Sequence, residues 1–259
     1  MMKKFAIIGA GNMGGAIAVG LSMSSYAYTL DIWVSDPDEQ KLSALRRAYP
    51  NLHTTTDSFE CAQYADYVLL AVKPWLVEQV LKSLQLQNIQ MLISIAAGVR
   101  IASLKEWMGH EDAAIFRAIP NTAIRYRQSM TILAQEGASK EQLDDVKAVF
   151  DVLGSTILME EDKMAACTAV SSCGIAYVLK YVHASMQAGV ELGLKPHDAQ
   201  VLLAQTLKGA AALLEQKDAH PAVEIDKVCT PGGLTIKGIN ALEEGGFSAA
   251  VIKAIKASI

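Results

Sequence analysis

The sequence predicts two domains, an α/β domain built on a parallel sheet over residues 1–159 and an all-α domain over residues 160–259. In the first part, short apolar runs alternate with amphipathic segments, which is the pattern of a parallel sheet flanked by helices. After about Glu160 this alternation stops, and long stretches with helical periodicity follow. A glycine-rich turn after the first apolar run supports the same division, because it joins a strand to a helix.

The predicted strands are short and mostly uninterrupted by charge, as expected when helices cover both faces of a sheet. They span residues 4–8, 30–34, 67–72, 91–95, 114–119, 130–134 and 155–159. Helical patterns lie between them at residues 12–24, 38–48, 75–84, 101–108 and 139–152.

The second part of the chain is predicted to be helical. Residues 162–192 suit one extended helix, and Pro196 opens the next. Residues 197–216 and 233–257 carry helical patterns as well. Alanine and apolar residues occupy more than one face of these helices, which exceeds what an isolated domain of ~100 residues can bury. We therefore expect a homodimer formed through the helical domain.

Composition excludes several classes of protein. With 51% hydrophobic and 19% charged residues, the 259-residue chain is a compact globular protein. A net charge of −4 and the lack of basic runs argue against nucleic acid and anionic membranes as partners. No stretch is expected to span a bilayer. The four cysteines form no C-x-x-C pair and the five histidines are scattered, so we expect no metal site and mostly buried, reduced thiols in a cytoplasmic protein.

The glycine-rich turn predicts a dinucleotide site in a Rossmann-type domain. It follows the first strand, opens the first helix and reads Gly9-Ala10-Gly11-Asn12-Met13-Gly14. Gly9 permits the tight turn, Gly11 lets the backbone approach a pyrophosphate, and Gly14 allows close packing of helix on strand. The N-terminus of the helix then opposes the phosphate charge.

The end of the second strand bears on the choice between NADH and NADPH. Asp36 stands where an acidic residue binds a free ribose 2′-hydroxyl, which favours NAD. Ser35 could instead donate to a 2′-phosphate, and Arg46 or Arg47 could reach it. Asp36 also suits an ordinary turn. These residues leave the choice open.

Three further loops follow predicted strands and should meet at the carboxyl edge of the sheet, where ligands of open α/β sheets bind. One contains Ala71, Val72, Lys73 and Pro74, one contains Ala97, and one contains Asn121. Asn121 can orient a carboxamide or a ribose hydroxyl. Lys73 is a cation near the expected nicotinamide, although a solvated lysine at the end of a strand is the common alternative.

A second glycine loop, Thr230-Pro231-Gly232-Gly233-Leu234-Thr235, interrupts the helical part and precedes a new helix. A helix N-terminus behind such a loop suits a carboxylate or phosphate, and Thr235 could direct a hydroxyl group beside it. Alternatively, Thr235 is only a helix cap. No paired carboxylates or Ser-His-Asp arrangement supplies an acid or base, and His183 suits a helix face. An already activated, protonated imine would accept a hydride without such a group.

With these motifs together, the sequence resembles the pyrroline-5-carboxylate reductase family. The resemblance covers essentially the whole chain and rests on Gly9–Gly14, Ala71-Val72-Lys73-Pro74, Ser94-Ile95-Ala96-Ala97-Gly98, Arg117-Ala118-Ile119-Pro120-Asn121-Thr122, Gly174-Ile175-Ala176-Tyr177 and, most specifically, residues 228–239 running into Leu242-Glu243. It implies NAD(P)H-dependent reduction of 1-pyrroline-5-carboxylate to L-proline. It also implies a helical domain that interlocks two subunits, often in larger rings of dimers.

The resemblance also implies roles for individual residues. Backbone N–H groups of Gly232, Gly233 and Leu234 would bind the substrate carboxylate, and Thr235 would hydrogen-bond the imine nitrogen. The nicotinamide would be lined by Val72, Lys73 and Pro74, with Asn121 and Ala97 nearby.

Some positions depart from the family pattern. Thr230 replaces the usual serine before Pro-Gly-Gly and keeps a hydroxyl group in the substrate loop. Asp36-Pro37-Asp38 stands where many members have Asn-Arg-Ser, and Ser58 aligns with an asparagine that they offer to the cofactor. The motif Gly-Ser-Gly-Pro-Ala-Tyr is Ser172-Cys173-Gly174-Ile175-Ala176-Tyr177 here. Because the family leans to NADPH, these changes leave NADPH or NADH as the cofactor.

Two alternatives remain. A β-hydroxyacid dehydrogenase has a similar domain order but requires a lysine on the first long helix with an asparagine one turn later, and Lys180 is followed by Ala184. A non-catalytic dinucleotide-binding module would bind cofactor without turnover and would not need Thr235.

Overall fold

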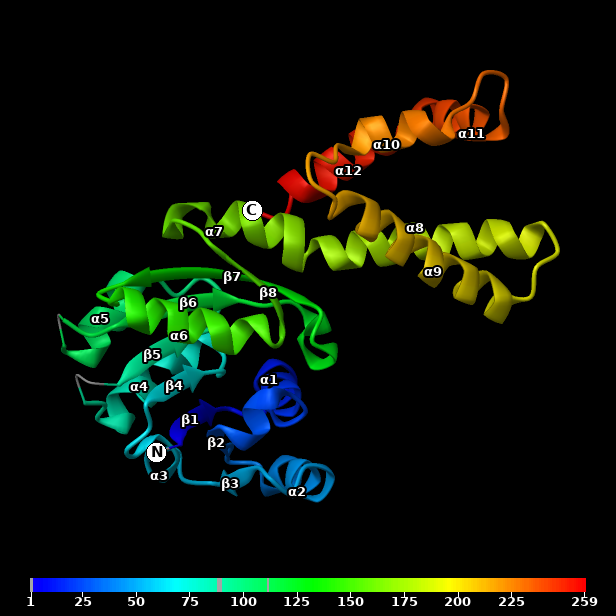
Figure 1. Cartoon of the computed structure of the whole chain (residues 1–259). Coiled ribbons are helices and arrows are strands. Elements are labelled where there is room, and N and C mark those ends of the chain that lie inside the picture. The colour runs from blue at the N-terminus through cyan, green and yellow to red at the C-terminus, as the bar shows by residue number, and fades with distance from the viewer. Residues whose placement is uncertain (1, 88–89, 111) are drawn as a thin grey trace. The chain divides into compact units, whose positions relative to one another are not determined.

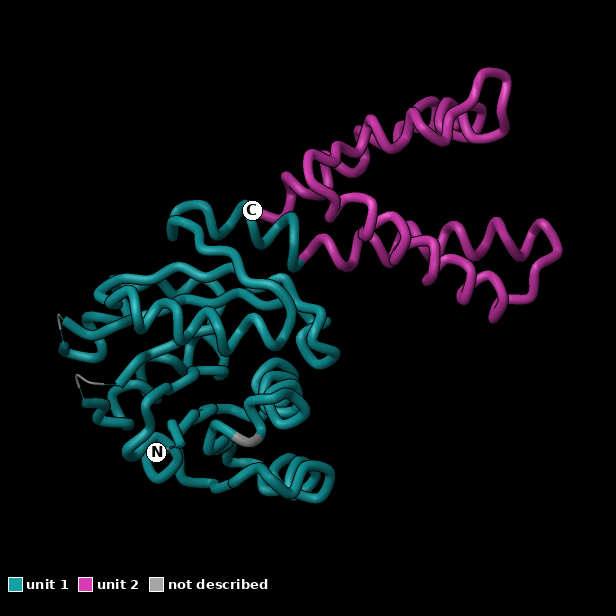
Figure 2. Tube along the Cα trace, viewed as in Figure 1, with its two compact units in different colours: residues 1–172 teal, residues 173–259 magenta. Residues whose placement is uncertain are grey.

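The computed structural model describes residues 2–87, 90–110 and 112–259. The chain forms two compact units that divide between Ser172 and Cys173 (Figure 2). The predicted limits, 1–159 and 160–259, place the division earlier, at the point where the last strand ends and the helices begin.

The first unit is built on an eight-stranded sheet with the order β3-β2-β1-β4-β5-β6-β7-β8 (Figure 1). Its strands are β1 (Lys3–Ile8), β2 (Leu30–Ser35), β3 (His53–Thr55), β4 (Tyr67–Leu70), β5 (Met91–Ser94), β6 (Ile115–Ile119), β7 (Ser129–Glu136) and β8 (Gly154–Leu158). All neighbouring strands are parallel except β6 and β7. The predicted strands are confirmed, and β3 is an addition of only three residues.

Helices cover both faces of this sheet, which explains the uniformly apolar strands. They are α1 (Asn12–Ser22), α2 (Glu39–Ala48), α3 (Ser58–Ala62), α4 (Val77–Leu84), α5 (Ile101–Met108) and α6 (Lys140–Asp151). Along β1, Phe5 and Ile7 join the core beneath α1, α2 and α6, whereas Ala6 and Ile8 join the core beneath α3, α4 and α5. This alternation is the two-residue period of a strand buried on both faces.

The cysteines are less buried than the sequence predicted. Cys61 is completely buried, and burial raises the pKa of its thiol to about 12. The other three, Cys167, Cys173 and Cys229, are partly exposed. Only Cys61 therefore behaves as a core residue.

The predicted long helix at 162–192 consists of several segments. They are the 3₁₀ turn η4 (Glu161–Lys163), α7 (Met164–Cys167), the π-helical turn η5 (Thr168–Ser172) and α8 (Gly174–Glu191). The hydroxyl groups of Thr168 and Ser171 donate to the carbonyl oxygens of Met164 and Cys167, at 2.6 and 2.9 Å. Such bonds back to the preceding turn loosen the regular helical ladder.

The expectation that no stretch could span a bilayer is wrong on length and composition. Residues 161–191 form one helical stretch of 31 residues, and an 18-residue window within it has a mean hydropathy of 1.3. Only 6% of its apolar window is buried within the chain. The helices that follow bury few of their residues as well, so exposed apolar residues are a property of the whole second unit.

The second unit contains α8, α9 (Pro196–Leu214), α10 (Pro221–Val228), α11 (Leu234–Glu244) and α12 (Phe247–Lys256). The predicted helix 233–257 is two helices, because Gly246 has a φ of +76° and separates α11 from α12. The helix α10 was not predicted. Tyr177 of α8 contacts the end of α12 through hydrogen bonds to Ser258 and to the Ala254 carbonyl.

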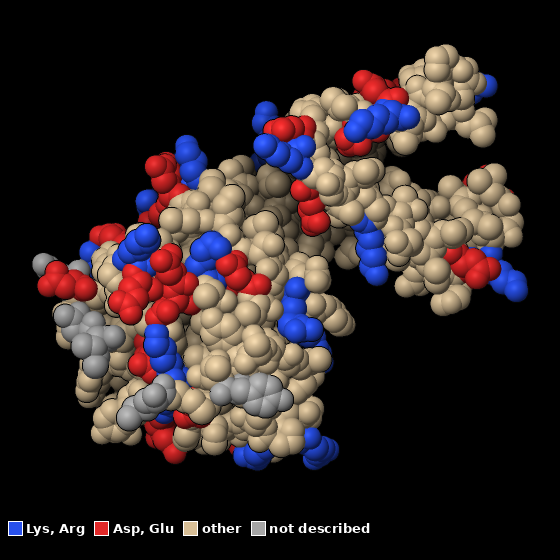
Figure 3. All heavy atoms as spheres, viewed as in Figure 1, with Lys and Arg blue, Asp and Glu red and all other residues tan. Residues whose placement is uncertain are grey.

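The helices of the second unit leave most of their apolar surface uncovered. The helices α8, α10, α11 and α12 contain no buried residue, and α9 buries only Ala199. Exposed large side chains include Leu179, Leu192, Val201, Leu202 and Leu234. Uncharged atoms cover most of the visible face of this unit (Figure 3). Apolar patches of this kind mark protein interfaces.

Candidate active site

The glycine-rich turn has the geometry that a dinucleotide site requires. Gly9 has a φ of +110°, and its N–H donates to the carbonyl oxygen of Ser35 at 2.7 Å. A Cβ on Gly9 would lie 2.7 Å from the carbonyl oxygen of Ala71. Gly9 therefore allows the turn between β1 and α1 to lie against the end of β4.

The other two glycines of the motif differ in what surrounds them. A Cβ on Gly14 would lie 2.0 Å from the carbonyl oxygen of Gly9 and 2.8 Å from the Ala71 side chain. A Cβ on Gly11 would meet no atom within 4 Å. Gly14 thus serves packing of helix on strand, whereas Gly11 leaves open space in front of the turn.

Gly11 is also the N-cap of α1 and provides no side-chain cap, so the first N–H groups of this helix are available to an anion. Asn12 and Met13 form the first turn of α1. These residues fit a pyrophosphate.

The predicted cofactor loops lie along one edge of the sheet, because β1, β2, β4, β5 and β6 are parallel. Val72 reaches the glycine turn, with its Cγ1 atom 3.3 Å from the position of a Cβ on Gly9. Lys73 is exposed and is the N-cap of the 3₁₀ turn η2 (Pro74–Leu76). Ala97 is exposed beside Gly98, whose φ is +77°. The structure therefore brings the loops after β4 and β5 to the edge that holds the glycine turn.

Asn121 lies at the same edge but is occupied by the protein itself. It is 5% exposed, and its Oδ1 accepts the N–H of Ala123 at 3.0 Å as the N-cap of a 3₁₀ turn. Its Nδ2 donates to the carbonyl oxygen of Ser171 at 3.3 Å. The side chain thus fixes the loop after β6 and the π-helical turn. Its predicted contact with the cofactor stays a prediction.

Asp36 is buried at the end of β2 and contacts the glycine turn directly. Its Oδ2 accepts the N–H of Ala10 at 2.8 Å. Its Oδ1 accepts the N–H of Asp38 at 3.0 Å and the ammonium group of Lys41 at 3.3 Å. The carboxylate holds the pKa of Lys41 above its ordinary value, mainly through that hydrogen bond. Sequence reasoning missed Lys41, and its only signal was a cation one helical turn beyond the Asp-Pro turn.

The two serines proposed for the cofactor lie side by side. The hydroxyl oxygens of Ser35 and Ser58 are 3.2 Å apart. Ser35 is completely buried at the end of β2, and Ser58 is the first residue of α3. Ser58 is the more accessible of the two to a ligand.

A second feature that could not be predicted from the sequence is an ion pair next to the loop between β5 and α5. The Glu161 carboxylate accepts the N–H of Ile101, at the start of α5, and a guanidinium N–H of buried Arg117, both at 2.7 Å. Burial acts to raise the pKa of Glu161, but these donors and nearby Arg100 outweigh it and hold that pKa below its ordinary value. The pair joins β6, α5 and η4 and so supports the loop that contains Ala97.

In the second unit, the loop before α11 is shaped by its glycines. Gly232 has a φ of +72°, and a Cβ on Gly233 would lie 2.5 Å from the Thr230 hydroxyl oxygen. The N–H of Gly233 donates to the carbonyl oxygen of Thr230 at 2.9 Å. Gly233, not Thr235, is the N-cap of α11, so the interpretation of Thr235 as the cap is wrong.

The first turn of α11 is therefore open to a ligand. Within the part of the chain that the structure describes, no acceptor is recorded for the N–H groups of Leu234 and Thr235. Leu234 is 87% exposed, and Thr235 is exposed as well. Uncapped N–H groups at a helix N-terminus bind anions.

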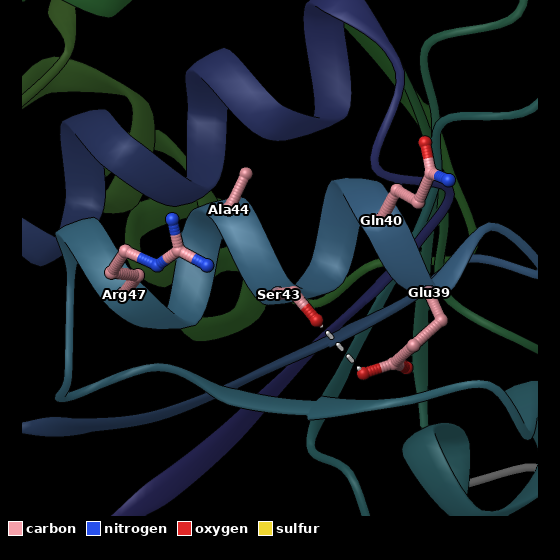
Figure 4. A pocket seen from close by; sticks show the side chains of 5 residues that line it. All are labelled: Glu39, Gln40, Ser43, Ala44 and Arg47. Carbon is pink, nitrogen blue, oxygen red and sulfur yellow. Dashed lines mark hydrogen bonds between the residues drawn. The ribbon is translucent and has the colours of Figure 1, made fainter.

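One hollow on the surface is formed by none of these residues. It measures about 330 Å³ and is lined by Glu39, Gln40, Ser43, Ala44 and Arg47, all from α2 (Figure 4). None of these residues is among the predicted cofactor or substrate ligands. A surface formed by one helix positions no reacting groups, so we assign it no role in the chemistry.

A mainly parallel sheet with a glycine-rich turn at its carboxyl edge defines a dinucleotide-binding protein. Family models agree for both parts of the chain. Residues 4–98 match a model described as NADP oxidoreductase, coenzyme F420-dependent. Residues 161–259 match a model described as pyrroline-5-carboxylate reductase dimerisation.

Individual relatives identify the family. The chain is 37% identical to pyrroline-5-carboxylate reductase of Synechocystis, over all of this chain and 96% of the relative. It is 35% identical to pyrroline-5-carboxylate reductase 1 of Dictyostelium discoideum, of whose length it spans about half (48%). The crystal structure of the Plasmodium falciparum pyrroline carboxylate reductase with NADP bound superposes with a TM-score of 0.86 at 27% identity, covering 99% of this chain and 95% of that one. The chain belongs to the pyrroline-5-carboxylate reductase family.

Proposed function

We propose that this protein reduces 1-pyrroline-5-carboxylate to L-proline, the last step of proline biosynthesis, with NAD(P)H as the hydride donor. The observation that carries the proposal is the presence of two glycine loops with open helix N-termini, at Gly11 and at Gly233. The first suits the pyrophosphate of a dinucleotide and the second suits a small carboxylate.

On the cofactor side, the residues present fit the dinucleotide. The open space at Gly11 and the uncapped start of α1 would hold the pyrophosphate. The nicotinamide would lie along Ala71, Val72, Lys73 and Pro74, near Ala97 and Asn121. A bound reduced nicotinamide supplies the hydride.

On the substrate side, the carboxylate would accept N–H groups from the loop before α11. Because the N–H of Gly233 already donates to Thr230, the N–H groups of Gly232 and Leu234 are the better donors. Thr235 would direct its hydroxyl group to the ring nitrogen. The ring nitrogen of a protonated imine already carries a positive charge. No acidic side chain is therefore needed to polarise the C=N bond before hydride transfer.

The second domain, 160–259, would combine substrate binding with dimerisation. The uncovered apolar faces of α8 to α12 support a homodimer, and we propose that such dimers assemble further into rings. Burial of these faces between subunits accounts for the hydropathy of residues 161–191 in a soluble, cytoplasmic protein.

The role of Thr235 is tested by two substitutions. Thr235→Ala should lower kcat/KM by roughly ten- to a hundredfold, or about 1–3 kcal/mol at the transition state, because one hydrogen bond to the nitrogen is lost. Thr235→Ser keeps the hydroxyl group and should retain most of the activity. Equal kcat/KM for the alanine variant and the wild type would leave Thr235 without a part in the reaction.

The function itself is tested against its alternatives with a panel of substrates. Purified protein should oxidise NADH or NADPH only when 1-pyrroline-5-carboxylate is present. Turnover of β-hydroxyacids instead would favour the dehydrogenase alternative. Cofactor binding without turnover of either substrate would favour the non-catalytic module.

A further inference from the structure

The carboxylate of Asp36 joins the glycine turn to the start of α2, because it accepts N–H groups from both. Its Oδ2 accepts the N–H of Ala10, the residue directly before Gly11. In dinucleotide folds an acidic residue at the end of the second strand binds the ribose hydroxyls of the adenosine half. The side chain of Asp36 is only 9% exposed, and hydrogen bonds hold both of its oxygens in place.

The hydrogen bonds of Asp36 leave one position free. A carboxylate offers about four acceptor positions. Two are used on Oδ1, by Asp38 N–H and Lys41, and one is used on Oδ2 by Ala10 N–H. The remaining position is on Oδ2, the oxygen that contacts the glycine turn. It can accept a hydroxyl proton, whereas a phosphate group has no proton to spare for it at neutral pH.

The cations near Asp36 do not reverse the local charge. Lys41 lies 3.3 Å from the Asp36 carboxylate and 3.6 Å from that of Asp38, so one ammonium group faces two carboxylates. Arg46 pairs with Glu39 at 2.8 Å and donates to Thr54 at 2.9 Å. Arg47 lies further along α2 and is exposed. At the Asp36 carboxylate itself, a 2′-phosphate would meet two carboxylates and one ammonium group.

We infer that Asp36 makes this enzyme prefer NADH over NADPH, by accepting the 2′-hydroxyl group and repelling a 2′-phosphate. The inference rests on the proposed function and adds the choice of cofactor to it. The family resemblance alone leans to NADPH, which is the opposite preference.

The test measures binding of NADH and of NADPH separately, by energy transfer from protein tryptophan to the reduced nicotinamide. Wild-type protein should bind NADH about tenfold more tightly than NADPH, or better. Asp36→Asn keeps the shape and removes the charge, and it should reduce this ratio by about tenfold. Asp38→Asn is the matched control, because it changes net charge equally and can still cap α2. Its ratio should fall clearly less than that of Asp36→Asn, because only Asp36 contacts the glycine turn.

Each outcome decides a separate point. Wild-type protein that binds both cofactors equally, or NADPH more tightly, overturns the assignment of Asp36. An equal change of the ratio in Asp36→Asn and Asp38→Asn overturns it as well, because the effect would then be one of overall charge. If Asp36→Asn does not fold, the wild-type ratio alone decides. Absence of binding of either cofactor contradicts the proposed function instead.

Discussion

Replacing Gly11 by alanine should weaken cofactor binding while leaving the fold intact. No protein atom lies within 4 Å of the added Cβ, and the φ and ψ of Gly11, −68° and −172°, are accessible to alanine. Alanine is a poorer N-cap than glycine by about 0.5–1 kcal/mol, and reduced entropy of the unfolded chain offsets about the same amount. The free energy of unfolding should therefore change by less than about 1 kcal/mol.

The effect on binding is larger because the methyl group would fill the space proposed for the pyrophosphate. Loss of close approach between backbone N–H groups and phosphate should cost about 1.5–3 kcal/mol, or roughly ten- to a hundredfold in Kd. Urea denaturation measures the stability, and titration with NADH and NADPH measures the affinity. A Gly11→Ala protein that binds both cofactors as tightly as the wild type would refute the assignment of this turn to the pyrophosphate.

Two further predictions concern packing and pH. Gly14→Ala should destabilise the first unit by about 1–3 kcal/mol, because its Cβ would lie 2.0 Å from a backbone oxygen, whereas Gly15→Ala, with 3.4 Å to its nearest atom, should be neutral or stabilising by up to about 1 kcal/mol. Equal melting temperatures for these two variants would contradict the packing role. Glu161→Gln should lower stability at pH 7 by about 1–3 kcal/mol, because buried Arg117 loses its charged partner. The folded pKa of Glu161 lies below its unfolded value, so its stabilisation is complete above the unfolded pKa and is lost as pH falls through the folded pKa. The difference in free energy of unfolding between wild type and variant should therefore shrink below about pH 4.5. A constant difference down to about pH 3 would argue against a stabilising role of the ionised Glu161 carboxylate.

The sheet and its helices could be predicted because burial on both faces leaves a strong pattern in the sequence. β3 was missed because a strand of three partly exposed residues has no such pattern. The reversed direction of β7 is set by its pairing with β6, and an apolar run carries no information about direction. The break between α11 and α12 depends on the positive φ of Gly246, and two glycines in a helical pattern do not fix that conformation.

The site was predictable where a backbone requirement forces a residue type. Gly9 and Gly14 have no room for a side chain, so the motif carries the geometry directly. The partners of Asn121 were not predictable, because Ser171 lies 50 residues away and meets it only through tertiary structure. The same holds for Asp36 and Ala10, which are 26 residues apart. Long-range hydrogen bonds decide whether a polar side chain is free for a ligand, and they are absent from local sequence patterns.

The central claim, hydride transfer to a cyclic imine, is tested most directly by isotope transfer. The purified protein is given 1-pyrroline-5-carboxylate and a cofactor deuterated at the transferring position of the nicotinamide, and the product is analysed by mass spectrometry and NMR. The account predicts L-proline that carries deuterium at C5, the former imine carbon. L-proline without deuterium at C5, after each face of the nicotinamide has been labelled in turn, or no L-proline at all, would contradict it.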